Sequence, residues 1–246
     1  MNRRSTQLLL AATALAAPAL LSACSGDASA EDRAATSTGS GAGSARTDRA
    51  VTVEHLLTDD DTVYSEGADW FRTSAHEGDG QSVFHPCATR SLEGTGATSV
   101  ARADFELRNL EDPTAEVTGD FLTQVVGEYD DEASARGAYD EIGAWLAECT
   151  QRPAGITDYT SFEPRVVDVD GATAQIVDSH YGPVPAELDP YGDEANIMET
   201  GIALSGSRVT VLTSVIVGQD YNFLDEDGGT PVNRMLPVAV DRLRSL

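Results

Sequence analysis

The chain has 246 residues, of which 41 are acidic and 16 are basic, and its formal charge at pH 7 is −25. All of the basic residues are arginines. This charge excludes nucleic acid as a partner and opposes adsorption to an anionic membrane surface, because both would repel the protein. The acidic residues are dispersed along the chain, which favours a solvated surface, while an attraction for cationic ligands or metal ions stays open.

The first 23 residues have the pattern of a bacterial lipoprotein signal peptide. Arg3 and Arg4 supply the positive region, Leu8 to Leu21 the apolar region, and Leu21-Ser22-Ala23-Cys24 forms a lipobox. The apolar run is shorter than the ~20 residues that cross a bilayer, which disfavours a transmembrane helix. We expect the mature chain to begin at Cys24, to carry diacylglycerol there, and to be anchored on the extracytoplasmic face of the cell membrane.

Residues 24–50 are predicted to be the lipidated cysteine and a disordered tether. Ser25 to Arg49 contain no aromatic or branched aliphatic residue, so they cannot bury enough apolar surface to fold. An ordinary signal peptide with an incidental cysteine is the alternative at this end, and Arg3-Arg4 leaves twin-arginine export open beside the general secretory route. The remaining residues, 51–246, are predicted to form a single domain.

The domain is predicted to begin with a short helix at Val53–Leu57. Strands follow at Val100–Leu107 and Phe121–Tyr129. The strongest helix signal covers Asp131–Cys149, where apolar residues recur at steps of three and four and acidic residues lie at the start. One face of that helix is therefore expected to be buried.

Two β-hairpins are predicted after this helix, with a long acidic loop at Tyr181–Glu194 between them. Their strands and turns are Val166–Val169 and Ala172–Val177 around Asp170-Gly171, then Ile202–Leu204 and Arg208–Val217 around Ser205-Gly206-Ser207. A last helix is predicted at Leu236–Leu246, with Pro237 near its first turn. Helices that arrive in blocks favour an α+β fold, with a mostly antiparallel sheet of about six strands and flanking helices in a single domain.

Cys87 and Cys149 remain once the lipobox has taken Cys24. An even number of cysteines on the outer side of the membrane predicts a disulfide between them. A metal site that uses Cys87 with His85 is the competing interpretation, but no second closely spaced pair of ligands accompanies it. We therefore expect a disulfide and no metal ion.

No catalytic motif and no cofactor motif stands out. Asp59–Asp61 is typical of a helix cap or exposed turn, and Asp225–Gly229 lacks the alternating spacing of a calcium loop. Trp70 and Phe71 fit either the core or the lining of a cleft. None of the four histidines has a partner at ligand or triad spacing: His55, His76, His85 and His180.

The order of several short segments resembles a known family. After the lipobox and tether come Leu56-Leu57-Thr58, Cys87, a strand ending Val125-Val126-Gly127-Glu128-Tyr129, and a helix ending Trp145-Leu146-Ala147-Glu148-Cys149. This order resembles the PknH-type extracellular sensor domain of actinobacterial receptor kinases and of lipoproteins that carry the same module. The resemblance implies an antiparallel sheet with flanking helices, a cleft for an unidentified ligand, and a disulfide at Cys87 and Cys149. The second disulfide common in the family is missing here.

These features predict a ligand-binding or sensing module of the cell envelope rather than an enzyme. Its partner would be a small molecule, a wall fragment or another envelope protein. A lipid carrier is the alternative, and an envelope hydrolase with a non-local active site is a further one. The lining of the cleft discriminates, because a lipid carrier needs a continuous apolar cavity and a hydrolase needs a serine or paired carboxylates beside a histidine.

Overall fold

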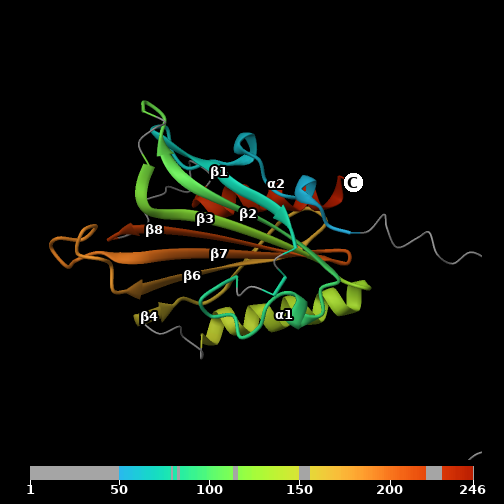
Figure 1. Ribbon diagram of the computed structural model, residues 1–246. Helices are drawn as coiled ribbons and strands as arrows, with labels where there is room; N and C mark the ends of the chain where they lie inside the picture. The colour runs from blue at the N-terminus through green and yellow to red at the C-terminus, as the bar shows by residue number, and fades with distance from the viewer. Residues whose placement is uncertain are drawn as a thin grey trace, which may run out of the picture. The chain divides into compact units, whose positions relative to one another are not determined.

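The computed structural model describes residues 50–245, except residues 79, 82–83, 113–115, 150–155 and 220–228. Among these residues one antiparallel sheet of eight strands has an α-helix on each face (Figure 1). The strands are β1 (Ala68–Glu77), β2 (Ser99–Asn109), β3 (Glu116–Glu128), β4 (Thr157–Ser161), β5 (Arg165–Val167), β6 (Thr173–Gly182), β7 (Ala195–Ser205) and β8 (Arg208–Gly218). The helices are α1 (Glu132–Glu148) and α2 (Pro231–Arg244), with short 3-10 turns at η1 (Val53–His55), η2 (Asp59–Asp61) and η3 (Glu93–Thr95).

The sheet order is β1-β2-β3-β8-β7-β6-β4, and β5 pairs with β6 beside β4. The predicted α+β class and antiparallel sheet are confirmed, with eight strands in place of six. Both predicted hairpins are present, and their tight turns use Gly171 (φ 70°) and Gly206 (φ 59°) in the left-handed region. The two strands that the sequence analysis did not predict, β1 and β4, are the edges of the sheet.

Trp70 and Phe71 belong to β1, and their side chains leave the strand on opposite faces. Trp70 is 1% exposed and meets Tyr64 edge-on at 5.4 Å between ring centroids. Phe71 faces the other way, with the Arg108 guanidinium 5.2 Å above its ring. Trp70 is therefore a core residue, and the strand around it was missed because the rest of β1 is mostly exposed.

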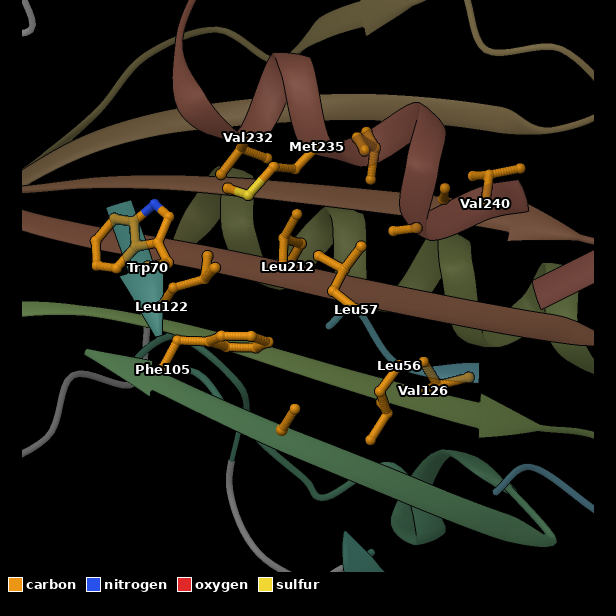
Figure 2. Close-up of a cluster of buried hydrophobic side chains, with 14 of the residues drawn as sticks. Leu56, Leu57, Trp70, Phe105, Leu122, Val126, Leu212, Val232, Met235 and Val240 are labelled. Carbon is orange, nitrogen blue, oxygen red and sulfur yellow. The ribbon is translucent and has the colours of Figure 1, made fainter. Parts of the chain in front are cut away.

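The larger core lies between the sheet and α2 (Figure 2). It joins apolar side chains of β1, β2, β3, β8 and α2 with the segment around η1; the labelled members are Leu56, Leu57, Trp70, Phe105, Leu122, Val126, Leu212, Val232, Met235 and Val240. Gly201 on β7 allows the close approach, since a Cβ there would lie 2.7 Å from Cγ1 of Val232. The helix begins at Pro231, five residues before the predicted start, so Pro237 lies inside it rather than in its first turn.

The second core lies between the sheet and α1. Ala135, Ile142 and Leu146 are buried against apolar residues of β3, β6, β7 and β8. Asp131 caps the helix by accepting the amide hydrogen of Ser134 at 2.8 Å, and Cys149 closes it with a left-handed backbone. The prediction of a helix over Asp131–Cys149 is confirmed, because these two residues are its caps. In the described part of the chain no helix is long and apolar enough to span a membrane.

Candidate ligand-binding site

A disulfide joins Cys87 to Cys149 and so ties the segment before β2 to the C-terminal cap of α1. The two Cα atoms are 4.6 Å apart, and both residues are buried. The hydroxyl of Tyr159, on β4, donates to Sγ of Cys87 at 3.2 Å. Because both sulfurs are used in the bond, neither is a thiolate that could bind a metal with His85. Groups of three or more His, Cys, Asp or Glu placed to hold a metal do not occur among the described residues.

His85 is a buried structural histidine. Its Nδ1 accepts the backbone amide hydrogen of Cys87 at 3.0 Å, so Nε2 carries the proton and donates to the Thr200 hydroxyl at 3.1 Å. Burial lowers the pKa of His85 to about 3, and the ring is therefore neutral. A nitrogen that already carries its proton cannot take one from Thr200, so this pair is not an activated nucleophile.

The other three histidines lie at separate places. His55 is buried in η1, where its Nδ1 accepts the amide hydrogen of Thr52 at 3.0 Å and closes a capping box. His76 is on the exposed end of β1, and His180 is on β6 with its ring edge-on to Phe162. The four histidines do not converge on one site.

At one end of the strands, the first described residues of the domain meet several charged groups; we call this end of the strands the tether edge. Ser99, Glu128, Arg208 and Ser205 are consecutive partners across β2, β3, β8 and β7 there. The backbone amide of Val51 donates to Oγ of Ser99 at 3.0 Å, so the described chain enters the domain at this end of the strands.

A buried ion pair forms the floor of the tether edge. Nε of Arg208 donates to Oε2 of Glu128 at 2.6 Å, and the Ser207 hydroxyl donates to Oε1 of the same carboxylate at 2.5 Å. The Glu128 side chain is 3% exposed. Arg208 also donates to the backbone carbonyl of Leu243 in the last turn of α2. This guanidinium therefore links β3, β8 and α2.

Two open hollows adjoin at the tether edge, above this ion pair. Their volumes are about 650 and 460 Å³, in the range of small-ligand sites, and they share Glu132 and Gly206. Six lining residues are acidic and three are arginines: Glu128, Asp130, Asp131, Glu132, Asp168 and Asp170, with Arg136, Arg208 and Arg244. The lining includes few apolar side chains and no histidine. The site is thus polar and net negative.

The sequence analysis did not identify these residues as a site. It placed Glu128 in a strand, Arg208 at the start of another and Asp170 in a turn, which is where they lie, but it did not bring them together. Asp59–Asp61 forms η2, where Asp61 accepts hydrogen bonds from Thr58 and from Arg242 at the far end of the chain. Cys24 and Asp225–Asp227 lie outside the described residues.

Fold and site define an α+β domain with an open, acidic hollow at one end of the strands of an antiparallel sheet. No family model matches the chain, and no curated protein matches it. Among solved structures it is similar to the extracellular domain of PknH from Mycobacterium tuberculosis, with 11% identity, a TM-score of 0.47, and coverage of 79% of this chain and 95% of that one. It is also similar to an uncharacterised protein from Mycobacterium smegmatis, an Rv0999 orthologue, with 9% identity, a TM-score of 0.40, and coverage of 80% and 98%. The PknH extracellular domain represents the family that the sequence resembles.

Proposed function

We propose that the protein is a lipid-anchored binding module on the extracytoplasmic face of the cell membrane, and that it takes a small polar ligand with a positive charge. The ligand would occupy the two hollows of the tether edge. The observation that carries this proposal is their lining, in which carboxylates outnumber guanidinium groups two to one. Such a lining attracts an ammonium or guanidinium group and repels phosphate and carboxylate.

The location rests on the three cysteines. A buried disulfide at Cys87 and Cys149 is typical of oxidising compartments outside the cytoplasm. The lipobox leaves Cys24 for diacylglycerol, and the charge of −25 leaves the acyl chains as the means of membrane attachment. The proposed organisation is a signal peptide over residues 1–23, a lipidated cysteine and tether over 24–50, and the binding domain over 51–246.

The lining also favours binding over the two alternatives. A lipid carrier needs a continuous apolar cavity, whereas the apolar side chains of these hollows, such as Leu204 and Leu243, stand among charged ones. A hydrolase with a serine nucleophile needs a base beside it, and Ser205 and Ser207 have no histidine among the residues that share their hollow. A wall fragment with a free amino group, or a polyamine, has the chemistry that this lining selects.

Native mass spectrometry of the protein purified from its own envelope in detergent tests the proposal. We expect a bound species that carries an amine, and we expect spermidine, used as a probe, to bind in calorimetric titrations. The Glu132→Gln and Asp168→Asn double variant should weaken spermidine binding at least tenfold. The matched control is Glu187→Gln, an exposed acid in the loop between β6 and β7 at the opposite end of the strands, which should bind as the unchanged protein does. Equal weakening by both variants, or no binding at all, would contradict the proposal.

A further inference from the structure

A carboxyl group is completely buried where α2 meets the sheet. Glu199, on β7, is 0% exposed and lies beneath the first turn of α2. Its Oε2 accepts the backbone amide hydrogen of Val232 at 2.9 Å, and its Oε1 accepts hydrogen bonds from the Thr230 hydroxyl and from Nη2 of Arg165, the latter at 2.8 Å. Glu199 therefore caps α2 from the sheet, in place of a capping side chain on the helix's own chain segment.

A second carboxylate shares the same guanidinium. Asp178, on β6, is the direct cross-strand partner of Glu199, so the two side chains leave the sheet on the same face. Nε of Arg165 donates to Oδ2 of Asp178 at 3.4 Å, and Nη1 donates to the side-chain oxygen of Asn233 at 3.3 Å. One positive charge thus serves two carboxylates.

The two strand neighbours of Glu199 each carry a buried oxygen with no hydrogen-bond partner in the described part of the chain. These are Oδ1 of Asp178 on β6 and Oγ of Ser214 on β8. Both can accept a hydrogen bond. A buried polar atom without a partner is costly, so a carboxyl hydrogen on Glu199 would have an available acceptor on either neighbouring strand.

A proton on Glu199 can be donated to one of these oxygens, and it removes the excess charge. With both carboxyl groups ionised, the cluster of Arg165, Asp178 and Glu199 carries one net negative charge in the interior; with one proton it is neutral. Burial raises the pKa of Glu199 to about 7, and the negative charge of Asp178 also raises it. The hydrogen bonds from Thr230 and Val232 and the charge of Arg165 lower this pKa but do not cancel the effect of burial. The other strand and helix groups that face the cluster, Ser214 and Asn233, are uncharged, and His180 lies two residues beyond Asp178 on β6.

We propose that Glu199 binds one exchangeable proton, and that this proton makes the contact between α2 and the sheet sensitive to pH. In the protonated state the carboxyl hydrogen of Glu199 is donated to Asp178 or Ser214, and the first turn of α2 stays held by a neutral cluster. Loss of the proton leaves two like charges around one guanidinium, and the α2 contact weakens. The proton leaves to solvent past Arg165 and Asp178, whose side chains are 40% and 30% exposed.

Carbon-13 NMR of glutamate carboxyl groups in the mature protein in detergent micelles tests the proposal. We expect one signal, absent in Glu199→Gln, to titrate with a midpoint near pH 7. Asp178→Asn should lower that midpoint by at least one pH unit, because it removes the neighbouring charge. The matched control Asp140→Asn, an exposed acid of α1 on the other face of the sheet, should leave it unchanged.

The readout for the contact itself is the melting temperature at pH 5.5 and pH 8. We expect the unchanged protein to melt several degrees lower at pH 8, and Glu199→Gln to show a smaller difference. A Glu199 midpoint below pH 5, or one that Asp178→Asn does not move, would overturn the proposal. If Glu199→Gln fails to fold, the titrations of the unchanged protein and of Asp178→Asn decide the question without it.

Discussion

Replacing both Cys87 and Cys149 by serine should destabilise the domain by about 4 kcal/mol. The bond closes a loop with a sequence separation of 62 residues. In the chain-entropy model a closed loop of this length removes about 14 cal/mol/K from the unfolded chain, which is about 4 kcal/mol at 25 °C. For a domain of this size each kcal/mol corresponds to about 2–4 °C, so the melting temperature should fall by roughly 8–16 °C.

Urea unfolding followed by circular dichroism measures the effect. The double variant and the chemically reduced protein should have similar midpoints, both well below that of the oxidised protein, because both lack the same constraint. The matched control is Cys24→Ala, which removes a cysteine outside the disulfide and should leave the midpoint unchanged. A loss below about 1 kcal/mol in the double variant would refute the reasoning, since the constraint on the unfolded chain would then not govern stability.

Three further changes have defined outcomes. Cys24→Ala should move the protein from the membrane pellet to the soluble fraction while it stays folded, and retention in the pellet after a salt wash would contradict lipid anchoring. Arg208→Ala should cost about 3–5 kcal/mol in urea unfolding because it leaves the Glu128 carboxylate buried and unpaired, whereas Arg90→Ala, which removes an exposed pair with Glu141, should change little. Glu199 has a folded pKa of about 7, above the ordinary 4.5, so the folded protein binds more protons and its stability should fall as pH rises from about 4.5 to 7. That fall, up to about 3 kcal/mol, should be absent in Glu199→Gln, and an equal pH dependence in both proteins would contradict it.

The elements that local sequence could predict are those whose signals are complete within a few residues. Helix α1 has its cap, its apolar stripe and its terminal cysteine in one run, and the two hairpins have glycine where their turns require a left-handed backbone. The edge strand β4 has no such signal, because its residues alternate between exposed and half-buried. Thr230-Pro231 is a pattern typical of the start of a helix, and α2 does begin there. The polar residues Asn233 and Arg234 follow directly, so the apolar stripe of the helix becomes recognisable only from Leu236.

The tether-edge site could not be predicted because its parts are distant along the chain. Glu128 and Arg208 are 80 residues apart and meet only because β3 pairs with β8. Nothing in either residue's neighbourhood specifies that pairing, which depends on how the whole sheet is ordered. The dispersed acidic residues predicted a solvated surface, and the hairpin turns at Gly171 and Gly206 gather some of them around the hollows.

Glu199 differs, because the sequence does carry a mark of it. Ile197, Glu199 and Ala203 lie on the same face of β7, the face that α2 covers, because every second residue of a strand points to the same side. Glu199 therefore places a carboxylate at a position where the pattern calls for an apolar residue. The predicted strand, Ile202–Leu204, does not extend to this position. A charged residue in an apolar register costs stability unless partners compensate it, and here the partners come from β5, β6 and α2. The interrupted apolar pattern therefore marks the position at which the fold holds a titratable group in its interior.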